Sequence, residues 1–187
     1  MNDDFIPMSL PMSQISHRLF VSDYAEAVAL ISKNPHKITA VLNVAQVPHE
    51  YVNPSIVYMH LSFADGEEIP PFHFVKCLGW LKFMYEWGHT ILIHCAEGVS
   101  RSVTICASFM HYMKMAEFND ALTQIKQIRP IANPAPETLS SAKRMLGVSP
   151  YDGSAGSCLY EKMIEEAFQG MDAARAASLH RRTDFSK

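Results

Sequence analysis

A cysteine and an arginine six positions apart lie in a segment whose residues could bind and cleave a phosphate ester. Residues 91–93 are Ile, Leu and Ile, an apolar run typical of a buried strand, and HCAEGVSRS follows directly at residues 94–102. Gly98 permits a tight loop, and the helix expected after it adds unpaired amides and a partial positive charge. Such a strand, loop and helix suit a tetrahedral dianion. We predict phosphate contacts from Ala96, Glu97, Gly98, Val99, Ser100 and Arg101.

Cys95 is the candidate nucleophile of this segment. The field that holds a phosphate also stabilises a thiolate, so we expect Cys95 to attack near neutral pH and form a cysteinyl phosphate. The planar guanidinium of Arg101 can hold two phosphoryl oxygens and stabilise the charge that spreads over them in the transition state. Covalent catalysis by cysteine requires no metal ion, and we expect neither a metal nor a cofactor.

The leaving oxygen needs a proton, which a carboxylic acid on a separate loop could donate. Asp65 is the candidate, because it follows an apolar run and precedes a glycine in the segment SFADGEE at residues 62–68. Asp-Gly is also an ordinary turn pair, and Glu67 and Glu68 are adjacent alternatives.

Short apolar runs that alternate with helical patterns must position these residues. Strands are predicted at Leu19–Val21, Ile38–Val44, Ile56–Leu61 and Thr90–His94. Helices are predicted at Asp23–Lys33, Phe72–Trp87, Ser100–Met115, Asn119–Ile128 and Ala135–Leu146. This order predicts an α/β fold with a mixed, mostly parallel central sheet, helices on both of its faces and a helical C-terminal half.

Composition adds limits on partners and location. The formal net charge of -3 gives no field that favours nucleic acid or an anionic membrane, and we expect contact with neither. The N-terminus lacks the features of a signal peptide, and no apolar run is long enough to cross a bilayer. The four cysteines show no pairing rhythm, which favours reduced thiols and a cytoplasmic or nuclear protein.

Cys77 and Cys106 are interpreted as small core residues. The alternative, a resolving cysteine that forms a disulfide with Cys95 on oxidation, stays open.

Three parts of the chain are expected. Residues 1–14 form an N-terminal segment, and residues 15–147 form the catalytic domain. Residues 148–187 comprise a linker rich in Gly, Pro and Ser, an amphipathic helix at residues 158–171 and a frayed tail from Asp172. The apolar stripe of that helix predicts packing on its own domain, or contact with a partner or a second copy of the chain.

The segment HCAEGVSRS resembles the H-C-x-x-G-x-S-R-S signature of the cysteine-dependent protein tyrosine phosphatases, and in particular the small dual-specificity phosphatases. The resemblance extends over roughly residues 15–146 and includes VLNVA at residues 41–45, the context of Asp65, and Arg129-Pro130. It implies that Asp65 is the general acid, that Ser102 helps the thiolate leave in the second step, and that His94 orders the loop. It also implies phosphorylated proteins as substrates, with hydrolysis of phosphotyrosine and also of phosphoserine or phosphothreonine.

One departure from this family concerns the support of the loop. Members commonly have Pro-Asn after the Arg-Pro pair, and here the pair is Pro134-Ala135, with Asn133 displaced by one position. We therefore expect the loop to be supported from elsewhere.

The sequence favours three rival functions less. Phosphoinositide phosphatases of this superfamily tend to have lysines in the loop, whereas Ala96, Glu97 and Val99 are neutral or acidic. Activity on the 5' end of RNA would favour a basic stripe with interleaved aromatic residues, which is not apparent. A phosphopeptide-binding module without catalysis would usually lack the cysteine or the arginine.

Overall fold

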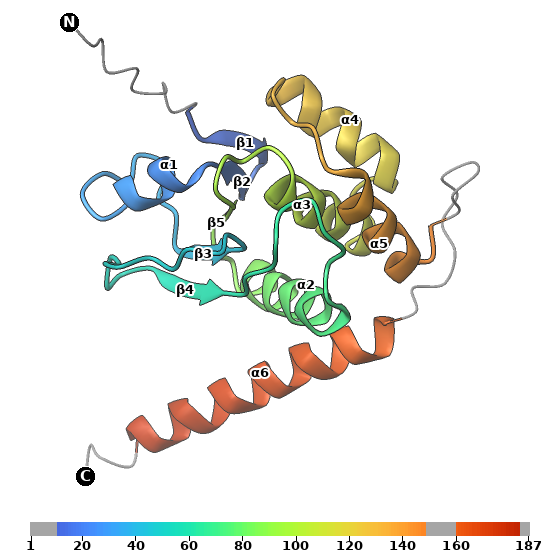
Figure 1. Ribbon diagram of the computed structural model, residues 1–187. Helices are drawn as coiled ribbons and strands as arrows, with labels where there is room; N and C mark the ends of the chain where they lie inside the picture. The colour runs from blue at the N-terminus through green and yellow to red at the C-terminus, as the bar shows by residue number, and fades with distance from the viewer. Residues whose placement is uncertain (1–10, 149–159, 184–187) are drawn as a thin grey trace, which may run out of the picture.

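A five-stranded sheet forms the centre of the protein (Figure 1). The computed structural model describes residues 11–148 and 160–183. The strands are β1 (Ser13–Ser16), β2 (Leu19–Ser22), β3 (Ala40–Asn43), β4 (Val57–His60) and β5 (Ile91–His94), and their order across the sheet is β1-β2-β5-β3-β4. β1 is antiparallel to β2, and the other pairs are parallel. The sheet is therefore mixed and mostly parallel, as the sequence predicts.

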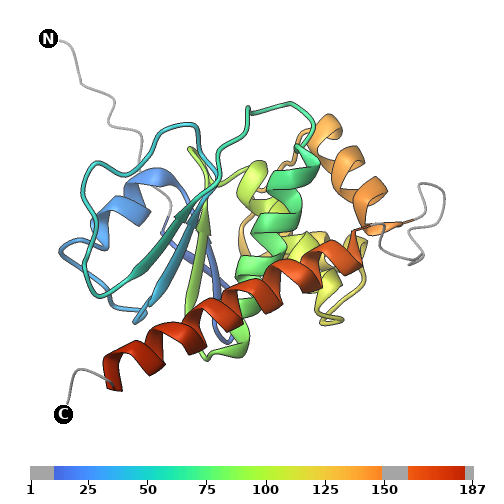
Figure 2. The ribbon, with the colours of Figure 1, turned by 90° about the horizontal axis from the view of Figure 1, so that it is seen from below.

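Six helices surround the sheet within the described residues. They are α1 (Tyr24–Ala29), α2 (Pro71–Glu86), α3 (Arg101–Tyr112), α4 (Phe118–Ile128), α5 (Pro136–Leu146) and α6 (Glu161–Thr183). Figure 2 shows α1 on one face of the sheet, and α2 to α5 on the other. Both faces are covered, and the C-terminal half is helical, which confirms the predicted fold class.

The alternation of side chains along the strands divides the core in two. Val41 and Leu92 point to the face of α1, where they pack with Phe20 and Leu30. The neighbouring strand positions point to the other face and join the larger core beneath α2 and α3. All four residues of β2, β3 and β5 are buried, which explains why these strands read as continuous apolar runs.

The parallel register places the carboxyl ends of the central strands side by side. His94 at the end of β5 lies opposite Ser22 of β2 and Asn43 of β3, and Asn43 in turn lies opposite His60 of β4. Loops that leave these ends meet at one edge of the sheet, which is where open α/β folds bind ligands.

Two elements in the N-terminal part of the chain, β1 and α1, differ from the sequence prediction. β1 was not expected, because Ser13-Gln14-Ile15-Ser16 has three polar residues and only Ile15 is buried. The helix expected over Asp23–Lys33 ends at Ala29, although Asp23 caps it as expected by accepting a hydrogen bond from the Glu26 amide.

Helix α6 packs against α2 of its own chain and crosses it at an angle (Figures 1 and 2). Ile164 is fully buried, and Phe168 packs edge-on against Phe83 of α2. Tyr112 at the end of α3 also donates a hydrogen bond to the carboxylate of Glu165. Of the roles expected for this helix, the structure shows packing against its own chain.

The bounds of α6 differ from those expected. It begins at Glu161 and continues to Thr183, past the expected end at Met171 and through the segment expected to fray. Alanine is the best helix former, and residues 173–177 read Ala-Ala-Arg-Ala-Ala, which accounts for the extension. Of the predicted linker at residues 148–157, residues 149–157 lie outside the described residues, as do the first two residues of the predicted helix, Cys158 and Leu159. No helix in the described part of the chain is both long and apolar enough to span a membrane.

Gly79 is the point of closest approach between α2 and α6. A Cβ at Gly79 would lie 2.9 Å from the Cβ of Ala167 and 3.3 Å from the carbonyl oxygen of Ile164, so a side chain there forces the helices apart. Gly170 in α6 is the matched position without this constraint, because a Cβ there meets nothing within 4 Å.

The substitutions Gly79→Ala and Gly170→Ala should therefore change stability in opposite directions. Gly170→Ala is expected to stabilise the helix by about 0.5–1 kcal/mol, because alanine has the higher helix propensity. Gly79→Ala is expected to lose about 1–3 kcal/mol through overpacking. Urea unfolding of the full chain measures both, and equal stabilisation by the two alanines would contradict the close packing of α6 on α2.

Candidate active site

The thiol of Cys95 lies at the bottom of the loop between β5 and α3. Cys95 is 2% exposed, and its sulfur accepts a hydrogen bond from the amide of Gly98 at 3.2 Å. The hydroxyl of Ser102 lies 3.3 Å from the same sulfur. An amide and a hydroxyl that point at sulfur can stabilise its negative charge, as can the N-terminus of α3 directly beyond the loop.

Gly98 fits a space that admits no side chain. Its φ of +68° lies in the left-handed region, and a Cβ would lie 2.5 Å from a guanidinium nitrogen of Arg129 and 2.6 Å from the carbonyl oxygen of Ser22. The loop thus rests directly on the end of β2. The sequence prediction that Gly98 provides the turn agrees with this geometry.

Arg129 holds the loop through two of its backbone carbonyls. Its Nε donates to the carbonyl of Gly98 at 2.7 Å, and an Nη donates to the carbonyl of Glu97 at 3.3 Å. The other Nη donates to the carbonyl of Pro11 and the hydroxyl of Ser13. Burial lowers the pKa of Arg129, and negative charge at Asp23, Cys95 and Glu26 acts in the opposite direction.

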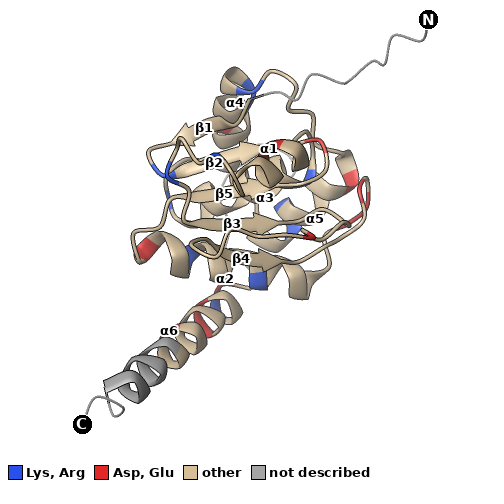
Figure 3. Ribbon diagram, turned by 90° about the vertical axis from the view of Figure 1, so that its left-hand side faces the viewer, with Lys and Arg blue, Asp and Glu red and all other residues tan. Residues whose placement is uncertain are grey.

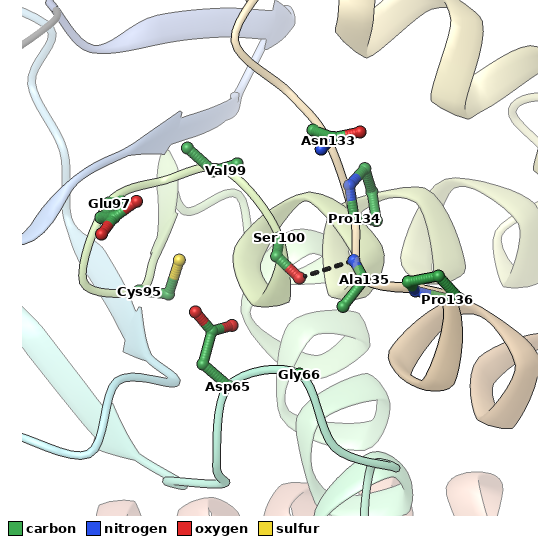
Figure 4. A pocket seen from close by; sticks show the side chains of 10 residues that line it. All are labelled: Asp65, Gly66, Cys95, Glu97, Val99, Ser100, Asn133, Pro134, Ala135 and Pro136. Carbon is green, nitrogen blue, oxygen red and sulfur yellow. Dashed lines mark hydrogen bonds between the residues drawn. The ribbon is translucent and has the colours of Figure 1, made fainter.

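The segment before α5 supplies further support through its backbone. The amide of Asn133 donates to the carbonyl of Val99 at 2.9 Å, and the amide of Ala135 donates to the hydroxyl of Ser100 at 3.0 Å (Figure 4). These contacts and Arg129 provide the alternative support expected from the replacement of the usual asparagine by Ala135.

Asp65 and Cys95 face a common cavity of about 480 Å³. In Figure 4, the carboxylate of Asp65 extends from the loop after β4 toward Cys95 and Ser100. The cavity is lined by Asp65, Gly66, Cys95, Glu97, Val99, Ser100, Asn133, Pro134, Ala135 and Pro136. The other two candidates for the general acid, Glu67 and Glu68, do not line this cavity. Glu68 instead forms an ion pair with Arg144 at 2.9 Å.

Arg101 links this loop to α3. Its Nε lies 3.1 Å from Asp65 Oδ1, without the alignment of a hydrogen bond, and an Nη donates to the carbonyl of Phe63 at 3.1 Å. The arginine side chain is 4% exposed and the aspartate side chain 56% exposed. The pair therefore brings a buried cation close to a carboxylate that solvent and ligand can reach. Arg101 does not itself line the cavity of Cys95 and Asp65, but lines a second cavity together with Ala96.

His94 lies behind the loop and pairs with a second histidine. Burial lowers the pKa of His94 to about 3, so its ring is neutral near neutral pH. Its Nδ1 lies 3.2 Å from the carbonyl of Cys95, which can only accept, so Nδ1 carries the proton. Its Nε2 then accepts from Nε2 of His49 at 2.9 Å. The tautomers of both rings follow from this chain of hydrogen bonds.

The sequence did not indicate His49 or the detailed role of Arg129. His49 belongs to the loop between β3 and β4, outside any motif, and its ring packs against Tyr24 and Tyr58 as well as His94. For Arg129 the signal in the sequence is the Arg-Pro pair, which does not itself specify a contact. A fully buried arginine is costly unless its donors are paired, and carbonyls of a nearby loop are natural acceptors.

Cys77 and Cys106 are buried in the larger core, as predicted. Burial raises the pKa of both thiols, so they stay protonated and unreactive. In residues 11–148 and 160–183, no three His, Cys, Asp or Glu side chains are placed to hold a metal ion.

The fold and this loop define a class of phosphatases. The family model of the dual specificity phosphatase catalytic domain matches residues 19–142. The chain therefore belongs to this family.

Several relatives carry the same description. The chain is 31% identical over 119 residues to dual specificity protein phosphatase 15 of Homo sapiens, and 29% identical over 158 residues to that of Mus musculus. These matches cover 63% and 84% of this chain, but 40% and 64% of the two relatives. The chain thus spans less than two thirds of their length.

Solved structures agree on the fold. The crystal structure of DUSP15 superposes with a TM-score of 0.69 at 27% identity, over 83% of this chain and 96% of that one. The crystal structure of human DUSP28 gives a TM-score of 0.64 at 18% identity, over 74% of this chain and 94% of the other, which supports the fold alone.

The substitution Gly98→Ala should disrupt the loop, and Gly66→Ala provides the matched control. Both glycines have positive φ, of +68° and +76°, but a Cβ at Gly66 meets nothing within 4 Å. Gly66→Ala should cost about 1–2 kcal/mol of backbone strain. Gly98→Ala should cost the same strain and about 1–3 kcal/mol more from the clash with Ser22 and Arg129.

Urea unfolding measures this difference in stability, and binding of inorganic phosphate reports on the shape of the loop. Equal destabilisation by the two alanines, with phosphate binding retained in Gly98→Ala, would contradict the close approach of the loop to β2.

Proposed function

We propose that this protein is a phosphatase that hydrolyses phosphotyrosine, and also phosphoserine and phosphothreonine, in protein substrates. The observation that carries the proposal is the environment of Cys95. Its sulfur accepts a hydrogen bond from the amide of Gly98 at 3.2 Å. Cys95 and Asp65 line the same cavity. Membership of the dual specificity phosphatase family supports the same reaction.

In the first step, the thiolate of Cys95 attacks phosphorus and a sulfur–phosphorus bond forms as the phosphorus–oxygen bond of the ester breaks. Protonated Asp65 donates its proton to the leaving oxygen. Arg101 and the amides of residues 96–101 donate hydrogen bonds to the equatorial oxygens. These donors stabilise the negative charge of the transition state. The 3.1 Å contact between Arg101 and Asp65 supports the placement of both groups at one reacting phosphate.

In the second step, Asp65 accepts a proton from the water that attacks the cysteinyl phosphate, and inorganic phosphate leaves. The hydroxyl of Ser102, 3.3 Å from the sulfur, donates a hydrogen bond to the departing thiolate. His94 acts as a positioning residue, since its neutral ring donates to the carbonyl of Cys95. No step needs a metal ion or a cofactor, because thiolate, carboxyl group and water supply every proton and electron pair.

The chemistry of the nucleophile favours a reducing compartment. Cys77, Cys95 and Cys106 are free thiols, and the reaction requires Cys95 to stay reduced. Because cytosolic and nuclear thiols are kept reduced, we place the protein in the cytoplasm or nucleus.

Replacement of the nucleophile should separate binding from turnover. Cys95→Ser is expected to release no measurable phosphate from phosphotyrosine and phosphothreonine peptides, because the serine hydroxyl is not ionised near neutral pH. Phosphate-peptide binding should persist, since the loop amides and Arg101 remain. Phosphate release in EDTA and a reductant, with peptide binding measured in parallel, checks both. Substantial turnover by Cys95→Ser would remove Cys95 from the mechanism.

Loss of the acid should affect poor leaving groups most. Asp65→Asn is expected to slow hydrolysis of an alkyl or phenyl phosphate by about 10²–10⁴-fold, because the leaving oxygen then departs unprotonated. An ester of a strongly acidic phenol should be slowed far less. The control is Glu67→Gln, a carboxylate of the same loop that does not line the cavity. If Asp65→Asn slowed both ester types equally, Asp65 would not be the proton donor.

A further inference from the structure

The charges around the cavity point to the kind of peptide that fits it, and this inference rests on the proposed function. Of the ten described residues that line the cavity, Asp65 and Glu97 are acidic and none is basic. In Figure 4, the two carboxylates lie on different sides of Cys95. Glu97 is exposed and forms no ion pair with any described residue.

Two further exposed carboxylates, Glu67 and Glu137, directly follow lining residues in the sequence. Glu67 is exposed in the loop of Asp65, and its carbonyl accepts a hydrogen bond from Thr138, which holds the loop against the start of α5. Glu137 is exposed in the first turn of α5, beside the lining residue Pro136. We call Asp65, Glu67, Glu97 and Glu137 the acidic rim. Figure 3 shows acidic segments on the loops and helix ends around α1 and α5.

The cations near the rim are already engaged. Arg101 is buried, and it contacts the carbonyl of Phe63 and the carboxylate of Asp65. Arg129 is buried behind the loop and pairs with four acceptors. Arg144 forms the ion pair with Glu68. Among the four rim carboxylates, Asp65 contacts Arg101, whereas Glu67, Glu97 and Glu137 form no ion pair with any described residue.

A substrate brings more negative charge to this place, because a phosphate monoester is close to a dianion near neutral pH. The loop amides and Arg101 compensate the phosphate itself, but the carboxylate of Glu97 still faces whatever residues flank it. A flanking lysine or arginine gains favourable interaction there, whereas a flanking aspartate or glutamate is repelled.

We propose that the acidic rim, and Glu97 in particular, selects phosphopeptides with lysine or arginine next to the phosphorylated residue and rejects those with acidic neighbours. The substrate class is thus a basic phosphorylated segment of a protein. Polyanionic esters, such as phosphoinositides, are disfavoured by the same carboxylates.

The test compares kcat/KM for phosphotyrosine peptides that differ only in flanking residues: Lys and Arg, Ser, or Asp and Glu. Each exposed charge pair is expected to change kcat/KM by about two- to fivefold, so the basic peptide should exceed the acidic one by about tenfold. Raising the salt from about 0.1 M to about 1 M shortens the Debye length from about 10 Å to about 3 Å and should remove most of the preference.

Substitutions then assign the preference to the rim. Glu97→Gln and Glu137→Gln keep the size of the side chain and should each reduce the ratio of basic to acidic peptide by about two- to fivefold. Glu166→Gln is the matched control, since it removes one charge from the exposed surface of α6 and should leave the ratio unchanged. Hydrolysis of p-nitrophenyl phosphate, which has no flanking charge, normalises each variant.

Failure of this inference differs from failure of the proposed function. Equal kcat/KM for basic and acidic peptides, or a ratio that Glu97→Gln does not change, overturns the selection while hydrolysis stands. No phosphate release from any substrate overturns the proposed function instead. In that case, binding of the same peptides to Cys95→Ser still tests the rim: tighter binding of the basic peptide supports it, and equal binding rejects it.

Discussion

The site depends on the close approach of Gly98 to the end of β2. Three groups meet at this glycine: the carbonyl of Ser22, the guanidinium of Arg129 and the sulfur of Cys95. Because a side chain would separate them, the loop can turn its amides toward one point only with glycine here. The parallel pairing of β5 with β2 brings Ser22 to that place, opposite His94 in the register. The order of the strands in the sheet therefore determines the shape of the phosphate-binding loop at residues 94–102, which we call the cradle.

Much of this arrangement was predictable from local sequence. Buried parallel strands and helix caps have clear local patterns, and the segment HCAEGVSRS combines strand, glycine and helix within nine residues. Asp65 was predictable as a candidate because it follows a strand at the same edge of the sheet. β1 was not, since its partner β2 stabilises a strand with only one apolar side chain.

Contacts between distant segments could not be predicted in the same way. His49 meets His94 only because β3 and β5 are neighbours, and the loop that carries His49 has no periodicity to indicate its path. Likewise, the packing of α6 depends on Gly79, which in isolation reads as a weak point of a helix. The helix α6 continues to Thr183, beyond the predicted end at Met171. The prediction used the last apolar residue of the stripe and not the alanine content of the residues that follow.

The contacts of Arg129 extend the site to the start of the described chain. Two of its four acceptors belong to the cradle, and the other two are the carbonyl of Pro11 and the hydroxyl of Ser13. A shortened chain that began at residue 15, where sequence patterns place the start of the domain, would keep every catalytic candidate. It would nevertheless leave one buried Nη of Arg129 without its two hydrogen-bond acceptors, which costs the desolvation of that donor. The smallest functional unit is therefore longer than the segment that contains the chemistry.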